Sequence, residues 1–270
     1  MTSGAPAESR TRPPVLFLTG VGLTAAVALR AIAELRTRFR LLEPRLGEPR
    51  QTRRTPVPTA EGALRSLDAA DVDQAHIVGL SFGATVAQEI ATRYPQRVRS
   101  LVLGSSTAGG ELYTPPEPAV RDFIRRLAEL PAEEGLWASV PYLYAPGTLR
   151  RHGLLIGADI TQRLRLPLDP ETYRGQLDIA RGHDSAARLA EISAPTLVVH
   201  GAQDRILPLD NGRLLAEGIA GARFLPLPGA AHAFPTDVAE ANQELVSFLL
   251  AHSPRRRGSP ARRTGRAARA

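Results

Sequence analysis

The stretch "HIVGLSFGAT", residues 76–85, places one serine between two glycines, with an apolar run before it and an alanine-rich run after it. The first run is typical of a buried strand, and the second has the spacing of a helix. A G-x-S-x-G turn between a strand and a helix holds its serine in a strained conformation with the hydroxyl exposed. We therefore predict that Ser81 is a nucleophile. The backbone N–H of Phe82, at the helix start, favours a developing negative charge.

Strand and helix patterns alternate along most of the chain. Strands are expected at 15–20, 40–44, 75–80, 98–106, 195–202 and 222–229. Helices are expected at 26–39, at 59–70 with Thr59 as N-cap, at 83–94 and at 237–252. Continuous apolar strands that alternate with helices are typical of a mostly parallel sheet flanked by helices. The expected fold class is therefore α/β.

Residues 111–190, here named the insertion, interrupt this alternation with helical patches, many prolines and no convincing strand. We expect a helical cap there, a core at 15–110 and 191–252, and a flexible N-terminus at 1–14. The segment 253–270 carries seven arginines and no acid, which account for the whole net charge of +7. A basic segment without apolar periodicity cannot bury a core, so we expect a disordered, solvated tail. Loose binding of nucleic acid through this tail alone is the alternative interpretation.

Composition excludes several kinds of chemistry. The 270 residues include no cysteine and no lysine, which excludes disulfides, thiolate sites and Schiff-base chemistry. The six histidines lack metal-ligand spacing, so no metal site is expected. No stretch has the length and apolarity of a signal peptide or a membrane span. We expect a soluble, cytoplasmic protein with no membrane partner, and the oligomeric state is left open.

A serine hydroxyl needs a base to take its proton, and the base needs an acid to hold its tautomer. "AQDRILP" places Asp204 in the loop after the strand at 195–202, and "PGAAHAF" places His232 in the loop after the next strand. Loops at the carboxyl ends of parallel strands meet at one edge of the sheet. The chain order Ser81, Asp204, His232 suits a Ser-His-Asp triad on this architecture.

Together, "GLSFG", "HGAQDRILP" and "PGAAHAF" resemble the α/β-hydrolase superfamily, in particular its cofactor-free esterase, lactonase and haloperoxidase-like branch. The resemblance covers most of residues 13–252. It implies Ser81 as nucleophile, Asp204 as acid, His232 as base and a helical cap over the site. It also implies that the backbone N–H of Val21 completes the oxyanion hole with Phe82.

Two stretches depart from the family pattern. Thr19-Gly20 stands where the family usually has His-Gly, which bears on the position of the oxyanion loop rather than on its chemistry. The usual D-x-R-G-x-G-x-S after the next strand is replaced by "EPRLGEPRQTRR" at 43–54. The pocket next to this rebuilt loop is therefore expected to be unusual.

The remaining polar and aromatic candidates have simpler interpretations. His76 and His200 lie within apolar runs and are interpreted as structural, and Ser105 and Ser106 as turn formers. The candidates for substrate binding are three aromatic residues of the insertion and one histidine, which could instead cap a helix: Trp137, Tyr142, Tyr144 and His183. The other carboxylates weighed as the acid are Glu111, Asp210 and Asp237.

The expected function is that of a serine hydrolase acting on a small or medium ester, lactone or related acyl substrate. The same triad could instead serve C–C bond hydrolysis, perhydrolysis or cyclisation, because this fold hosts many chemistries. A non-catalytic binder on the same scaffold is the second alternative. Dehalogenase and epoxide-hydrolase activities are excluded, since their nucleophile is an aspartate and this chain has Ser81.

Overall fold

The computed structural model describes residues 11–24, 32–46, 55–127, 129–165 and 169–254. Six parallel strands form one sheet in the order β2-β1-β3-β4-β5-β6. The strands are β1 (Pro14–Leu18), β2 (Arg40–Leu42), β3 (Ala75–Leu80), β4 (Val98–Gly104), β5 (Thr196–Gly201) and β6 (Arg223–Leu227). The chain adds β2 on one side of β1 and β3 on the other. The strand order therefore reverses between β1 and β3, and α/β proteins commonly bind ligands at the carboxyl ends of strands beside such a reversal.

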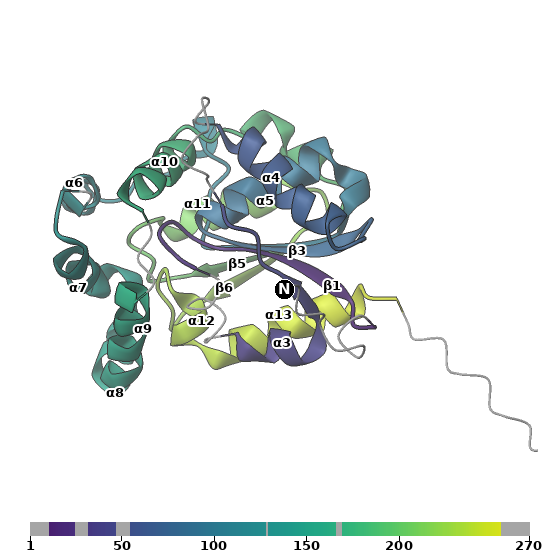
Figure 1. The fold of residues 1–270 in the computed structure, drawn as a ribbon. Coiled ribbons are helices and arrows are strands. Elements are labelled where there is room, and N and C mark those ends of the chain that lie inside the picture. The colour runs from purple at the N-terminus through teal and green to yellow at the C-terminus, as the bar shows by residue number, and fades with distance from the viewer. Residues whose placement is uncertain (1–10, 25–31, 47–54, 128, 166–168, 255–270) are drawn as a thin grey trace, which may run out of the picture.

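Helices cover both faces of the sheet (Figure 1). One face packs against α4 (Pro56–Asp68), α5 (Phe82–Arg93) and α11 (Leu209–Gly218), and the other against α3 (Ala33–Arg38) and α13 (Ala239–Ala251). Successive residues of β3 alternate between the two cores, with Ile77 in the first and Val78 in the second. Both faces are buried, which explains the continuous apolar runs of the strands. The expected α/β fold is confirmed.

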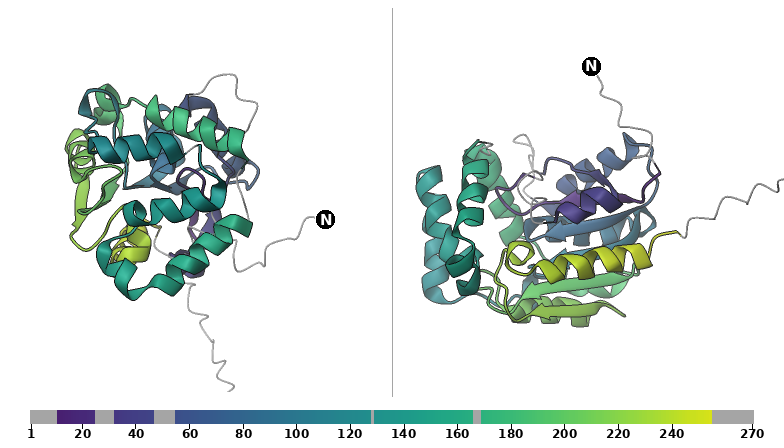
Figure 2. Two further views of the ribbon diagram at one scale, coloured as in Figure 1. Left: turned by 90° about the vertical axis from the view of Figure 1, so that its left-hand side faces the viewer. Right: turned by 90° about the horizontal axis from the view of Figure 1, so that it is seen from below.

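The insertion follows β4 and returns to β5. Its helices are α6 (Pro118–Leu127), α7 (Ala132–Leu143), α8 (Pro146–Arg151), α9 (Gly153–Arg165) and α10 (Pro170–Arg181), between the 3-10 turns η2 (Gly110–Leu112) and η3 (Ala186–Glu191). Figure 2 shows α6 to α9 standing off one end of the sheet. The N–H of Ala233, in the loop after β6, donates to the carbonyl of Leu143 at 2.7 Å. The insertion therefore meets the loops at the carboxyl ends of the strands.

Some boundaries differ from the sequence-based expectations. Helix α4 begins at Pro56 rather than after Thr59, because proline fits the first turn of a helix, where its missing N–H has no intrahelical partner. Strand β4 ends at Gly104, since Ser105 leaves the extended region with a φ of 45°. Of the helix expected at 26–39, residues 33–38 form α3, and 25–31 lie outside the described residues.

Two further helices, α11 and the short α12 (Phe234–Asp237), had not been expected. The terminal segments 1–10 and 255–270 also lie outside the described residues. Within the described part of the chain, no helix has both the length and the apolarity that spanning a membrane requires.

Candidate active site

Ser81 lies at the turn between β3 and α5, where its backbone has a φ of 51° and a ψ of −116°. A non-glycine residue in this region is strained and needs support from its surroundings. The flanking glycines allow neighbouring backbone to pack closely around this turn. A Cβ on Gly79 would lie 2.5 Å from the Gly83 carbonyl oxygen, and one on Gly83 would overlap the Leu18 carbonyl. Helix α5 therefore starts against the end of β1, at the reversal of strand order.

Three side chains from separate loops form a continuous chain of hydrogen bonds. The Nε2 atom of His232 is 3.0 Å from Ser81 Oγ, and its Nδ1 atom is 2.7 Å from Asp204 Oδ2. Ser81 follows β3, Asp204 follows β5 and His232 follows β6. Because an ionised carboxylate can only accept, Nδ1 carries the proton and Nε2 is left to accept from the serine hydroxyl. The structure thus brings together the three residues singled out from the sequence.

Asp204 is held in its ionised form. Its Oδ1 atom accepts the N–H groups of Ile206 and Leu207, each at 2.9 Å, and its side chain is buried. Burial by itself would raise the pKa of Asp204. The positive charge of His232 and the hydrogen bonds from His200 and His232 outweigh burial and hold that pKa well below its usual range. A permanently charged carboxylate at this position can stabilise an imidazolium.

His200, which was interpreted from the sequence as structural, directly contacts the loop of residues 204–207 that carries Asp204. Its Nε2 atom is 2.8 Å from the Leu207 carbonyl and 3.4 Å from Asp204 Oδ2. The ring is buried on β5, against Gly212 of α11, where any Cβ would meet Nδ1 at 2.5 Å. His200 therefore ties both ends of the acid loop together. The four-residue spacing between His200 and Asp204 is the sequence signal that could have indicated this contact.

The sequence predicts two backbone N–H groups as the donors of an oxyanion hole, those of Phe82 and Val21. Among the hydrogen bonds of the described residues, none gives an acceptor to the N–H of Phe82 or of Val21. Phe82 is the first residue of α5, where helix geometry leaves the N–H groups unpaired and the helix dipole favours negative charge.

The loop that carries Val21 lies close to the serine. A Cβ on Gly20 would be 3.4 Å from Ser81 Cβ. The Oγ1 atom of Thr19 donates to the Leu23 carbonyl at 2.9 Å, and the Leu23 N–H donates to the Gly20 carbonyl at 3.2 Å. Thr19 thus closes the loop through its hydroxyl, at the position where the family pattern has histidine.

Ser105 and Ser106, interpreted from the sequence as turn formers, also support the site. Ser105 has a φ of 45°, and its Oγ donates to the carbonyl of His232 at 3.0 Å. Ser106 Oγ donates to the carbonyl of Ser81 at 3.3 Å. The turn after β4 therefore contacts the backbone of both Ser81 and His232. Two adjacent serines at the end of a strand have no motif that would have predicted this role.

Comparison with known proteins identifies the family. The family model described as alpha/beta hydrolase fold matches residues 58–237, more than half of the chain. The chain is an α/β hydrolase. Its parallel sheet was expected from the alternation of strand and helix patterns, and the turn at Ser81 from the G-x-S-x-G motif.

Relatives of this α/β hydrolase act on different bonds. A candidate carbamate hydrolase of Azorhizobium caulinodans is 28% identical over 87% of this chain and 90% of its own. A 2-hydroxy-6-oxononadienedioate/2-hydroxy-6-oxononatrienedioate hydrolase of Cupriavidus pinatubonensis is 32% identical over 68% of this chain and 64% of its own. The solved structure of a thermophilic esterase from Thermogutta terrifontis is 27% identical, with a TM-score of 0.72 over 90% of this chain and 92% of the esterase. All three are similar to this chain and all three are hydrolases.

The aromatic residues of the insertion differ in their surroundings. Trp137 on α7 is 49% exposed. Tyr142 stacks on Phe123 with ring centroids 4.3 Å apart, and the guanidinium of Arg205 lies 5.0 Å from the centre of its ring. Arg205 directly follows Asp204, so Tyr142 joins the insertion to the loop of Asp204.

Tyr144 is a core residue of the insertion. It is buried with Ile156 and Ile160, and Ala233 beside His232 packs against the same cluster. Its hydroxyl donates to Asp159 Oδ2 at 3.5 Å, and burial is the main cause that raises the pKa of Tyr144 to about 12. Tyr144 is therefore a buried residue of the cluster on which the loop of His232 packs.

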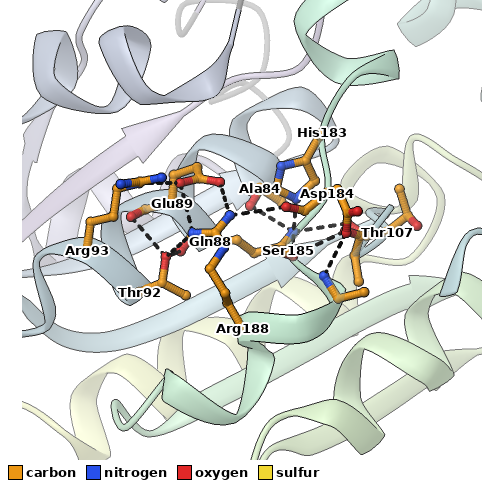
Figure 3. A network of polar contacts seen from close by, with 12 residues as sticks. Ala84, Gln88, Glu89, Thr92, Arg93, Thr107, His183, Asp184, Ser185 and Arg188 are labelled. Atoms are coloured by element: carbon orange, nitrogen blue, oxygen red, sulfur yellow. Dashed lines mark hydrogen bonds and ion pairs between the residues drawn. The ribbon is translucent and has the colours of Figure 1, made fainter. Parts of the chain in front are cut away.

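His183 is buried where the insertion rejoins the core, as Figure 3 shows. Its Nε2 atom is 3.3 Å from Oε1 of Gln88 on α5, and burial lowers the pKa of His183 to about 4. Ser185 Oγ donates to the same Gln88 oxygen at 2.7 Å, and Arg188 pairs with the buried carboxylate of Glu89. These contacts fix the end of the insertion on the helix that follows Ser81.

The other carboxylates weighed as the acid lie elsewhere. Glu111 is exposed on η2, and Asp210 pairs with Arg213 at 2.8 Å. Asp237 accepts the N–H of Ala231 at 2.8 Å and that of Ala145 at 3.1 Å, which joins the loop of the base to the insertion. Among the described residues, Asp204 is the carboxylate bonded to the His232 ring. That part of the chain gathers no group of three or more His, Asp or Glu side chains that could hold a metal ion.

Proposed function

We propose that this α/β hydrolase is a serine hydrolase that cleaves a small or medium ester, lactone or related acyl substrate. The observation that carries the proposal is the unbroken contact from Ser81 Oγ through His232 to the ionised Asp204. The strained, partly exposed serine and the two unpaired N–H groups beside it add the remaining requirements of acyl transfer.

In the proposed reaction, His232 Nε2 takes the hydroxyl proton while Ser81 Oγ attacks the substrate carbonyl carbon. The N–H groups of Phe82 and Val21 hold the oxyanion of the tetrahedral intermediate. Asp204 stabilises the imidazolium and keeps the ring in place. As the intermediate collapses, His232 gives the proton to the leaving alcohol and Ser81 keeps the acyl group. A water molecule, deprotonated by His232, then attacks the acyl ester formed on Ser81. His232 returns this proton to Ser81 Oγ as the carboxylic acid leaves.

We propose further that the insertion acts as the cap of this site, with its substrate contacts drawn from Trp137, Tyr142, Tyr144 and His183. Of these, Tyr142 has the strongest support, because it stacks against Arg205 next to the acid. A cap anchored to the loops of the oxyanion hole and of the base would limit the access of water and the size of the substrate.

Hydrolysis of a C–C bond is the second candidate. The relative from Cupriavidus pinatubonensis is named for a 2-hydroxy-6-oxo dienedioate, a molecule whose name includes no ester or amide, so its hydrolysis has to break a carbon–carbon bond. The same three residues could act on such a ketone. Incubation with a 2-hydroxy-6-oxo dienoate beside a panel of p-nitrophenyl esters and lactones separates the two candidates by which substrate is turned over.

Labelling by a fluorophosphonate tests the nucleophile. The probe should modify wild-type protein at Ser81, and Ser81→Ala should abolish both labelling and ester hydrolysis. Ser106→Ala is the matched control and should still be labelled at Ser81, because the hydrogen bond described for its Oγ goes to the Ser81 carbonyl. Peptide mapping that finds the label on Ser105 or Ser106 would overturn the assignment.

A further inference from the structure

Gln176, on the insertion helix α10, is buried and has both ends of its amide bonded. Its Oε1 atom accepts the N–H of Gly22 at 2.9 Å, and its Nε2 donates to the Leu46 carbonyl at 2.7 Å. Because one partner is a donor and the other an acceptor, the amide satisfies both in one orientation only. Gln176 therefore joins the insertion to the loop after β1 and to the segment after β2.

Gly22 belongs to the turn that sets the direction of the Val21 N–H. The turn is closed by the hydrogen bond from Leu23 to the Gly20 carbonyl, and Gly22 occupies its third position with a φ of 69°. The Gly20 carbonyl and the Val21 N–H belong to one planar trans peptide, so fixing the carbonyl on Leu23 directs the N–H to the opposite side. Any change in this turn would move the second oxyanion donor.

Helix α10 also packs on the turn directly. A Cβ on Gly22 would lie 2.9 Å from Cε2 of Tyr173, which is one helical turn before Gln176. The Tyr173 ring therefore covers Gly22 while the Gln176 amide holds its N–H. Two further contacts between the insertion and the core lie near His232 instead: the Leu143 carbonyl accepts from Ala233, and the Ala145 N–H donates to Asp237.

We propose that Gln176 is a positioning residue for the oxyanion hole, which makes the Val21 donor depend on the seating of helix α10. This proposal rests on the serine-hydrolase function proposed above. With α10 seated, both donors are in place before the reaction begins, and preorganised donors are what lowers the barrier. When α10 lifts, Gly22 loses its acceptor and the turn relaxes. Acyl transfer is thereby confined to the closed insertion, where water is limited.

The test measures the rate constant for fluorophosphonate labelling of Ser81, because the phosphoryl oxygen occupies the place of the oxyanion. Gln176→Met keeps the length of the side chain and removes both hydrogen bonds. It should lower the labelling rate and the kcat for p-nitrophenyl acetate about 10- to 100-fold. This decrease is smaller than the one expected when a whole oxyanion donor is removed, and KM should change less than about threefold. Gln74→Met is the matched control, a half-buried glutamine just before β3 whose Nε2 donates to the Val98 carbonyl at 3.3 Å, and it should stay within about threefold of wild type.

Gln176→Glu gives a second readout that does not depend on how Gln176→Met folds. A protonated carboxyl can accept from Gly22 and donate to the Leu46 carbonyl as the amide does, whereas an ionised one cannot donate. Burial raises the pKa of such a carboxyl, so labelling relative to wild type at the same pH should recover as the pH falls from 8 to 6. No labelling of wild type would overturn the serine-hydrolase proposal itself. If wild type is labelled but Gln176→Met reacts as fast as Gln74→Met, or if Gln176→Glu shows no recovery at low pH, only the role of Gln176 is overturned.

Discussion

At the scale of single residues, the two oxygens of Asp204 have separate tasks, and this makes a sharp prediction for Asp204→Asn. Oδ1 accepts two backbone N–H groups, so the amide oxygen of an asparagine has to take that place. The NH₂ group then donates to His232 Nδ1, which favours the tautomer whose Nε2 carries the proton. That tautomer cannot accept from Ser81, so kcat should fall by a factor on the order of 10³ to 10⁴.

The matched control for Asp204→Asn is Glu111→Gln, the same neutralisation on an exposed carboxylate. Circular dichroism should show both variants folded, since the amide is nearly isosteric with the carboxylate. The acid would be wrongly assigned if Asp204→Asn kept more than about a tenth of the wild-type kcat while Glu111→Gln lost most of it.

Residues that follow strands could be predicted from the sequence, and residues on helices could not. Ser81, Asp204 and His232 each lie in the turn or loop that follows an apolar run, and parallel strands gather such positions at one edge. Gln176 is one polar residue of an amphipathic helix, 154 positions from the glycine it holds. Such a long-range contact has no sequence pattern, because it arises only once the insertion is packed on the core.

At the scale of elements, the central strands were easier to predict than the starts of helices. β3 was predicted with its observed bounds because "AHIVGL" is apolar throughout and is ended by the nucleophile turn. The start of α4 was wrong because Thr59 is a good N-cap in isolation, whereas Pro56 fits the first turn equally well. Helix α11 has glycines at Gly212 and Gly218, which weaken its helical pattern.

Buried His76 links three elements and makes stability depend on pH. Its Nδ1 contacts Ser100 of β4 at 2.7 Å, and its Nε2 contacts Ser253 after α13 at 3.0 Å. Burial, then the charges of Arg99 and His252, lower the pKa of His76 from 6.5 to about 4. Between pH 4 and pH 6.5, His76 therefore binds more protons in the unfolded chain than in the folded one. The stabilisation is complete above pH 6.5 and is lost as the pH falls towards 4.

For His76 alone, the free energy of unfolding should fall by about 2 kcal/mol between pH 7 and pH 5. Urea titrations measure the free energy of unfolding at pH 7 and at pH 5. In His76→Gln, the decrease in this free energy from pH 7 to pH 5 should be smaller than in wild type by about that amount. The exposed His152→Asn is the matched control and should keep the wild-type difference. An unchanged difference in His76→Gln would show that protonation of this ring is not coupled to unfolding.

At the scale of the whole molecule, the end of the sheet that carries Ser81 and the opposite end are held by different contacts. The insertion contacts three loops at the carboxyl ends of the strands through Gln176, Leu143 and Ala145. The other end is held by His76, where the end of α13 is fixed on the central strand β3 through Ser253. Loss of contacts at the first end should therefore change catalysis, and loss at the second should change stability alone.

Two truncations test this division, and they differ by only two residues of the chain. Removing 255–270 should leave Tm and ester hydrolysis unchanged, because this arginine-rich segment has no apolar periodicity with which to pack. Removing 253–270 also deletes the Ser253 Oγ that accepts from the buried His76 N–H, and an unpaired buried donor costs about 1–2 kcal/mol. Tm should fall by roughly 3–6 °C in this longer truncation, with kcat unchanged. Ser253→Ala in the full chain should reproduce that loss, whereas a loss of several degrees on removing 255–270 alone would show that the tail docks on the folded body.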